Sequence, residues 1–289
     1  MRELNYNIQI IKEFKIGDDI AIPFLFSLDK IRAFNTQVPI ISNECDGNYK
    51  SEMLTDEFAD RLFQYVYREY IIVEYDKDFL ANYTYDAVSL EGKNKMTYEK
   101  VKRLIEFGAV TGYSEREVKE VLNHVEAYQE LLRLIKTKDK LSEDDIKDLH
   151  AIIQKDIIIG GVYRNVNVQI PGATHQPPSN IKVYMRMQRM FSDLLDNDFD
   201  LFNEGLFIHA NLAKIHPFLD GNGRVGRLVL NFYLIKAGLI PISIPLKYRD
   251  EYFSAMDHYK NEKDFIPLKN FIIKLLNERY QTLIEKLEL

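Results

Sequence analysis

Apolar residues recur every three or four positions along most of the chain, the spacing that places them on one face of an α-helix. Between residues 77 and 91, for example, Phe79, Tyr83 and Leu90 share such a face. Stripes of this kind predict helices over residues 77–91, 114–134, 142–154, 182–195, 205–215 and 225–237. Two more helices are predicted to begin at about residue 55 and at residue 97. The pattern therefore predicts a mostly α-helical protein.

Capping residues mark several of these helix ends. Ser114 with Glu117 forms a capping-box pattern, and Ser142 stands where it can cap the following helix. Gly92 follows the 77–91 stripe, and a helix commonly ends with a left-handed glycine at this position. Glu91 is therefore expected in the last turn of that helix.

The pattern changes to alternation of apolar and polar residues between residues 160 and 178. The apolar members are Val166, Val168 and Ile170, and the residues between them are polar. Alternation with period two is typical of a strand. The segment 160–178 is predicted to form a short β-hairpin with Gly172 near its tip, and a surface hairpin without function is the plainer interpretation.

Composition narrows the function classes. The chain has 289 residues, of which 46% are hydrophobic and 28% charged, and its net charge of −6 offers no broad basic surface for nucleic acid. Cys45 is the only cysteine, which favours a reducing compartment such as the cytoplasm. No segment approaches the roughly 18 apolar residues of a membrane span, and the N-terminus lacks a signal peptide. Secretion by a route that reads no N-terminal signal stays open.

The segment 216–227 carries groups suited to binding and transferring a phosphate. Gly221, Asn222 and Gly223 directly precede a predicted helix, where backbone N–H groups and the helix dipole favour an anion. Arg224 and Arg227 lie in the first turns of that helix, where cations are unfavourable unless an anion compensates them.

Two further groups complete this segment. Asp220 offers a hard oxygen ligand that suits Mg²⁺ bridging phosphates, and His216 is the nearby group able to act as a base near neutral pH. Taken singly, a Gly-Asn-Gly turn, a surface arginine pair or a structural histidine is each commonplace. Their combination within twelve residues favours a catalytic site.

Residues 216–227 resemble the Fic motif, His-Pro-Phe-x-Asp-Gly-Asn-Gly-Arg-x-x-Arg, at every specified position. The resemblance extends from about residue 84 to about 240. It implies a helical bundle with a short β-hairpin flap, and an enzyme that transfers AMP from ATP to a protein hydroxyl with Mg²⁺.

The resemblance also implies a role for each matching residue. His216 would deprotonate the hydroxyl of a Tyr, Thr or Ser side chain, on a target protein or on the enzyme itself. The nucleotide-binding residues would be Gly221, Asn222, Gly223, Arg224 and Arg227, with Asp220 holding the metal. Val168, Ile170 and Gly172 of the flap would position the target strand, and a flap argues against the phosphotransferase branch of the family.

Glu91 resembles the inhibitory glutamate that precedes the core in many Fic proteins and pairs with the second arginine of the motif, here Arg227. The family motif has Ser or Thr four residues before this glutamate, whereas this chain has Ala87, with Ser89 displaced by two. This class relieves inhibition by moving the helix or changing oligomeric state, so a homo-oligomer is expected. In some relatives the glutamate instead supports removal of AMP from the modified target.

The expected organisation has three parts. Residues 1–75 form an N-terminal region of unknown role, 76–245 a Fic domain with its inhibitory helix at about 77–92, and 246–289 a helical C-terminal extension. Besides removal of AMP, two alternatives to an enzyme that transfers AMP from ATP stay open. They are a non-catalytic module that binds a peptide strand, and a transferase using another nucleotide or a phosphocholine donor.

Overall fold

A computed structural model describes residues 9–11, 51–53, 77–170 and 175–286, with side chains described from 79 to 170 and from 175 to 279. Strands β1 (Gln9–Ile11) and β2 (Ser51–Met53) pair antiparallel. The helices are α3 (Lys77–Ser89), α4 (Tyr98–Phe107), α5 (Glu115–Thr137), α6 (Glu143–Ile153), α7 (Asn180–Asp196), α8 (Leu201–Ile215), α9 (Asn222–Lys236), η1 (Leu246–Tyr248), α10 (Arg249–Glu262) and α11 (Ile266–Lys286). The mostly helical prediction is confirmed.

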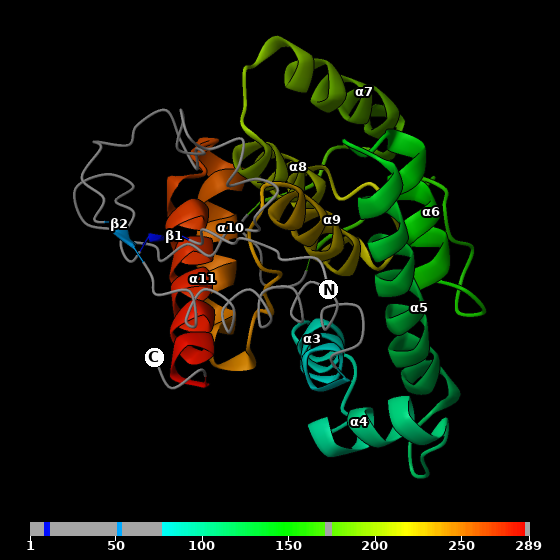
Figure 1. Cartoon of the computed structure of the whole chain (residues 1–289). Helices are drawn as coiled ribbons and strands as arrows, with labels where there is room; N and C mark the ends of the chain where they lie inside the picture. Colours follow the sequence, from blue (N-terminus) through cyan, green and yellow to red (C-terminus); the bar gives the residue numbers. More distant parts are fainter. Residues whose placement is uncertain (1–8, 12–50, 54–76, 171–174, 287–289) are drawn as a thin grey trace.

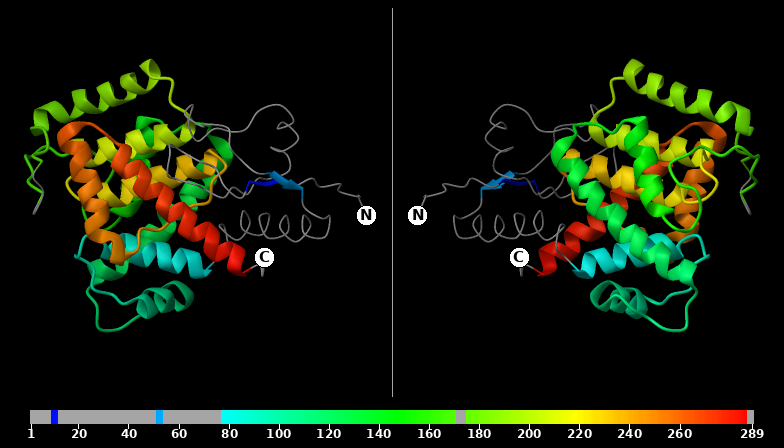
Figure 2. Two further views of the ribbon diagram at one scale, coloured as in Figure 1. Left: turned by 90° about the vertical axis from the view of Figure 1, so that its left-hand side faces the viewer. Right: turned by 90° about the vertical axis from the view of Figure 1, so that its right-hand side faces the viewer.

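Helices α8 and α9 form the centre of the bundle. Figure 1 shows α5 and α6 against one side of this pair and α10 with α11 against the other. The views in Figure 2 place α7 along one edge of the bundle and α3 with α4 at the opposite edge. Within the described ranges, no helix is both long and apolar enough to cross a membrane.

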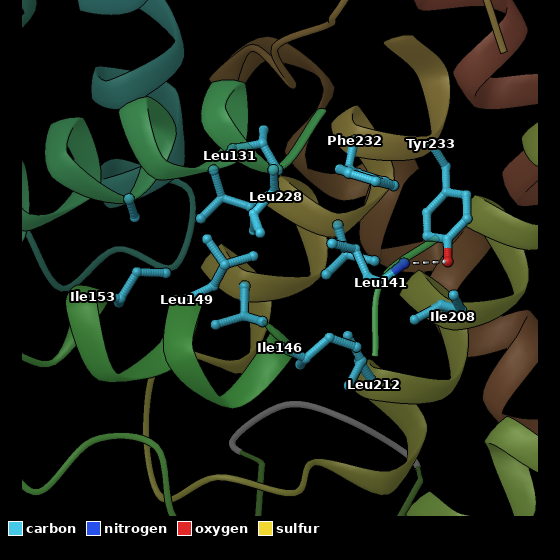
Figure 3. Packing of buried hydrophobic residues seen from close by; sticks show 14 of the residues in the cluster. Leu131, Leu141, Ile146, Leu149, Ile153, Ile208, Leu212, Leu228, Phe232 and Tyr233 are labelled. Carbon is cyan, nitrogen blue, oxygen red and sulfur yellow. Dashed lines mark hydrogen bonds between the residues drawn. The ribbon is translucent and has the colours of Figure 1, made fainter. Parts of the chain in front are cut away.

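Two clusters of buried side chains meet at the central pair. The first joins α8 and α9 to α5 and α6, and Figure 3 shows Leu131, Leu149 and Leu228 pointing toward one another within it. The second joins α8 and α9 to α10 and α11. Most of α9 is buried as a result, including Asn222 and Arg224 in its first turn.

Gly205 lets α8 and α9 approach closely. A Cβ atom at this position would lie 2.5 Å from the Cβ of Tyr233, a separation that real structures do not show. The Tyr233 hydroxyl in turn accepts a hydrogen bond from the Leu141 amide at 3.3 Å, which ties α9 to the start of α6. Helices α8 and α9 are therefore packed closely against each other, and α9 is also hydrogen-bonded to the residues before α6.

The predicted caps are present where the structure describes them. Ser114 and Glu117 form the reciprocal bonds of a capping box at the start of α5, and Ser142 forms one with Asp145 at the start of α6. Helix α3 ends at Ser89, so Glu91 lies in the turn after the helix and not in its last turn. The helix predicted from about residue 55 lies outside the described residues.

The predicted β-hairpin is not confirmed. Within residues 160–170 and 175–178 the backbone is irregular and contains no strand; the tip, with Gly172, lies outside the described residues. The reason lies in the hydrogen bonds. Arg164 donates to the carbonyls of Val166 and Pro178, and Asn180 donates through its side chain to the carbonyl of Asn165. Side chains thus bridge the two legs of the segment where a hairpin would have a backbone ladder.

Leu228 offers a test of the packing. It is fully buried in the cluster between α5, α6 and α9, so Leu228→Ala should lower the free energy of unfolding by about 3 kcal/mol through lost burial and a residual cavity. Phe107→Ala is the control, since Phe107 is 74% exposed and its loss should change stability by about 0.5 kcal/mol or less. Equal effects of the two substitutions in denaturant titrations would contradict this packing.

Candidate active site

The segment between α8 and α9 begins at His216, which takes a left-handed backbone conformation with φ of 50°. Its amide still donates to the Leu212 carbonyl at 2.9 Å, and Pro217 then has no N–H with which to continue the helix. The imidazole of His216 is held at the C-terminal end of α8, half-buried.

Burial lowers the pKa of His216 to about 4, and the nearby charge of Lys260 acts in the same direction while Glu91 opposes it. The imidazole is therefore neutral at pH 7 and has a free lone pair for accepting a proton. A neutral histidine at this position meets the first requirement of a general base.

Asn222 closes the turn through both ends of its amide. Its Oδ1 accepts from the Phe218 amide and its Nδ2 donates to the Phe218 carbonyl, both at 2.9 Å. The Asn222 side chain is 3% exposed, and its oxygen and nitrogen both bond within the turn. Both polar ends of the Asn222 side chain thus shape the turn, and the nucleotide-binding role of Asn222 stays a prediction.

The N-terminus of α9 presents donors without a side-chain cap. Gly221 is the N-cap with φ of 80°, and no side chain caps the helix there. The first-turn N–H groups of α9, from Asn222 to Arg224, have no acceptor within the helix. Arg224 is 4% exposed, and its Nη1 has no hydrogen-bond partner in the described part of the chain. Such a concentration of buried donors fits an anionic ligand.

Glu91 lies against this helix terminus. After α3 the chain turns at Gly92, whose φ is 74°, and Glu91 Oε1 comes within 3.5 Å of Arg227 Nη2. A Cβ added to Gly223 would lie 2.2 Å from the same oxygen. The Glu91 carboxylate therefore occupies the space beside Gly223, where an anion would meet the terminus of α9.

Arg227 is also bound to the backbone of α3. Its Nη2 donates to the Ala87 carbonyl at 2.8 Å, while its buried Nε has no hydrogen-bond partner among the described residues. The sequence lacks the expected Ser or Thr at position 87, but here the backbone of Ala87 supplies the contact. Ser89, the displaced hydroxyl, is buried without a hydrogen-bond partner in the same described set.

A second arginine, besides Arg227, binds the backbone at the end of α3. Arg249, the first residue of α10, donates from Nε to the Leu90 carbonyl at 2.9 Å. The turn that carries Glu91 is thus held by one arginine from α9 and one from α10.

Asp220 is held by two cations that the sequence did not indicate. Lys93 Nζ lies 2.8 Å from Oδ1 and Arg116 Nη2 lies 2.5 Å from Oδ2, while the Gly221 amide donates to Oδ1 at 2.9 Å. Burial alone would raise the pKa of Asp220, but the hydrogen bond from Lys93 and the charge of Arg224 outweigh it, so the pKa is lowered. The carboxylate is ionised at neutral pH.

The donor set fits a metal shared with a ligand. In the described part of the chain, no group of three or more His, Cys, Asp or Glu side chains could enclose a metal ion. A single ionised carboxylate is nevertheless what Mg²⁺ uses when nucleotide phosphates and water complete its octahedron. The two cations at Asp220 show that this carboxylate already attracts positive charge.

Arg164 fastens the described ends of the 160–178 segment to the turn that begins at His216. Its guanidinium is 5% exposed and donates to the carbonyls of His216 and Val166 at 2.8 Å and of Pro178 at 2.5 Å. Its amide donates to the Pro217 carbonyl at 2.9 Å. The planar guanidinium of arginine can donate to several carbonyls at once. Arg164 therefore fixes the position of the two ends of this segment relative to His216.

The predicted target-positioning residues are placed only in part. Val168 and Ile170 are half-buried in the irregular segment that Arg164 fixes, and Gly172 lies outside the described residues. His175 is half-buried, with its Nε2 2.9 Å from the Lys214 carbonyl oxygen. The segment therefore lies along the end of α8 next to His216.

Residues 140–234 match the model of the Fic/DOC family. The chain contains a Fic/DOC family domain. This match covers α6 to α9, and the motif residues described above lie within it, whereas Glu91, Lys93 and Arg116 precede it.

Curated relatives agree with this assignment. The chain is 33% identical over 203 residues to the protein adenylyltransferase Fic of Drosophila willistoni, and 31% identical over 200 residues to that of Drosophila grimshawi. The matches cover 68% of this chain but 40% and 41% of the relatives, so the chain spans about two fifths of their length.

The fold is similar to those of two solved structures. They are Fic-1, residues 134–508, from C. elegans, and a Fic domain containing signaling protein from Bacteroides thetaiotaomicron. The TM-scores are 0.62 and 0.61, the identities 24% and 22%, and the alignments cover 80% and 78% of this chain and 77% and 96% of those chains. These likenesses support the helical bundle.

Arg164 provides a test of how the segment is held. Arg164→Met should lower the free energy of unfolding by roughly 3 kcal/mol, because three carbonyls lose their donor in a buried setting. Arg164→Lys should recover only part of this loss, since one ammonium cannot span the three acceptors. Thermal or urea unfolding would measure both; full recovery by lysine would show that charge alone matters at this position.

Proposed function

We propose that this chain is a protein adenylyltransferase that transfers AMP from Mg-ATP to a Tyr, Thr or Ser hydroxyl of a protein, and that Glu91 inhibits it at rest. The observation that carries the proposal is the N-terminus of α9, where uncapped N–H groups and buried Arg224 and Arg227 lie a few residues from neutral His216 and ionised Asp220. The names of the curated relatives support the same activity.

The chemistry follows from these placements. His216 accepts the proton of the acceptor hydroxyl as its oxygen attacks the α-phosphate of ATP, and the bond to pyrophosphate breaks on the opposite side. The N–H groups at the start of α9 and the two arginines hold the phosphate oxygens and stabilise their charge. Mg²⁺, held by Asp220 together with the phosphates, supplies further charge neutralisation when bound.

The acceptor is a protein segment laid beside His216 by residues 160–178, with Val168 and Ile170 on the near leg. Since this segment has an irregular backbone among the described residues, the acceptor is aligned along that leg and not by an existing hairpin. The acceptor includes the enzyme itself. We place the protein in the cytoplasm on the evidence of its single cysteine, and propose a homo-oligomer whose assembly controls Glu91.

Inhibition follows from charge and space. The Glu91 carboxylate lies beside Gly223 and 3.5 Å from Arg227, so a phosphate oxygen and this carboxylate compete for the same donors. The ion pair is loose and the Glu91 side chain is 26% exposed. A ligand that carries several negative charges can therefore displace it.

Removal of AMP from a modified protein is the second candidate function. The Glu91 carboxylate is partly exposed at the edge of the anion site, a position from which it can orient a water molecule toward a phosphate held at α9. In this reaction Glu91 would be required and not inhibitory, so the same residue separates the two directions.

Glu91→Gly tests the proposed activity. Loss of the carboxylate should raise incorporation of label from α-labelled ATP into the enzyme or a lysate by about tenfold, equivalent to about 1.4 kcal/mol for a partly buried competing ion pair. His216→Ala in the same background should abolish labelling while leaving nucleotide binding intact. Labelling that does not rise in Glu91→Gly, or that persists without His216, would exclude this proposal.

Lys93→Gln tests competition at the metal end of the site. Because the Lys93 side chain is 57% exposed, its ion pair with Asp220 is worth about 0.2–1 kcal/mol. Its removal should lower the Mg²⁺ concentration needed for half-maximal ATP binding roughly 1.4- to fivefold. Lys95→Gln, an exposed lysine two positions away, should leave the Mg²⁺ requirement unchanged. An unchanged or higher requirement in Lys93→Gln would mean that Lys93 does not compete with the metal.

A further inference from the structure

His150 of α6 lies beneath the catalytic turn, outside the residues of the Fic motif. It is 1% exposed and both of its ring nitrogens have partners. The Gly161 amide lies 2.9 Å from Nδ1, and the Asp220 carbonyl oxygen lies 2.9 Å from Nε2. One side chain therefore connects the start of the 160–178 segment with the residue proposed to hold the metal.

The two partners fix the tautomer of the ring. A backbone N–H can only donate and a backbone carbonyl can only accept. Nδ1 must therefore offer its lone pair to Gly161, and Nε2 must carry the hydrogen that goes to Asp220. Burial lowers the pKa of His150 to about 4, which agrees with a neutral ring.

Packing holds this ring in one orientation. It stacks on Phe218 with centroids 3.8 Å apart and an interplanar angle of 10°. Phe218 is fully buried and its backbone is bonded on both sides by Asn222. The imidazole has no freedom to choose other partners without moving the turn.

The glycines at 160 and 161 allow the segment to reach the ring. A Cβ at Gly160 would lie 2.6 Å from the Cα of Ala151, and one at Gly161 would lie 3.3 Å from its Cβ. The chain passes directly over α6 here, and its left-handed turn at Gly161, with φ of 73°, aims the amide at Nδ1. The contact depends on a close approach that larger residues would prevent.

We infer that His150 is a positioning residue with two separable duties, an inference that rests on the proposed function. Through Nε2–H it orients the Asp220 peptide, so that the carboxylate of Asp220 faces the metal. Through Nδ1 it anchors the start of the segment that lays the acceptor beside His216. Partners that orient a ligand in this way typically change metal affinity or activity about 10- to 100-fold when removed.

Two isosteric substitutions separate the duties. His150→Asn places an amide oxygen near Nδ1, so it keeps the bond from Gly161 and loses the bond to Asp220. His150→Gln places an amide nitrogen near Nε2, so it keeps the bond to Asp220 and loses the bond from Gly161. Both are made in the full chain with Glu91→Gly, and two quantities are measured, namely Mn²⁺ affinity in the presence of a non-hydrolysable ATP analogue and the AMP transfer rate at saturating Mg-ATP.

The two variants should fail in different ways. His150→Asn should bind Mn²⁺ about tenfold more weakly than its parent and approach the parent's rate at saturation. His150→Gln should bind Mn²⁺ like the parent and transfer AMP about tenfold more slowly at saturation. Leu149→Val, at a buried neighbouring position on α6, is the control for general loosening of the helix. It should lower the melting temperature but leave both the Mn²⁺ affinity and the AMP transfer rate at the values of the parent.

Other results would overturn the inference. If both His150 variants lose Mn²⁺ affinity and rate in parallel, or if both match the parent after correction for stability, His150 is a structural histidine. A parent chain that binds the nucleotide analogue but no Mn²⁺, or that transfers no AMP, would instead refute the proposed function, and the assignment of His150 would fall with it.

Discussion

Two positive charges buried at the positive end of a helix are the constraint on which the rest of the site depends. Arg224 and Arg227 belong to the first two turns of α9 and are 4% and 3% exposed. The helix dipole already favours anions there, and an uncompensated buried charge costs several kcal/mol. Acceptors must therefore converge on this terminus, and the Ala87 carbonyl with the carboxylates of Glu91 and Asp220 supply them from two different parts of the chain.

The compensation is incomplete, and this explains how the fold can be stable at rest and still accept a ligand. Glu91 is 3.5 Å from Arg227, Asp220 is 3.9 Å from Arg224, and each arginine keeps a buried nitrogen without a hydrogen-bond partner among the described residues. Internal partners neutralise part of the charge of the two arginines. Under the proposed function, the remaining donors are those that the phosphate oxygens would use.

The sequence predicts those features that arise from neighbouring residues. Capping boxes at Ser114 and Ser142 and the turn before α9 are local patterns, and each is found in the structure. The contact of Lys93 with Asp220 joins residues 127 positions apart, and only the folded chain brings them together. The sequence shows that a lysine, Lys93, follows Gly92, but it does not show which acidic residue this lysine contacts.

The segment 160–178 shows why a local pattern can also mislead. Alternation of Val166, Val168 and Ile170 with polar residues is typical of a strand, because successive side chains of an extended chain point to opposite sides. Extended backbone can satisfy its polar groups without a ladder, and here Arg164 and Asn180 take the carbonyls. A buried arginine within a predicted hairpin was the feature that argued against regular pairing.

The contact between Arg249 and Leu90 lies outside the range matched by the family model, but it holds the turn that carries Glu91. The match stops at residue 234, whereas Arg249 is the first residue of α10. Side chains of α10 and α11 also share a buried cluster with α8 and α9. Under the proposed function, the part of the chain that performs the chemistry is shorter than the part that restrains it, and the two could diverge at different rates in evolution. Relatives with the same motif but another C-terminal region would then keep the reaction and differ in how strongly it is inhibited.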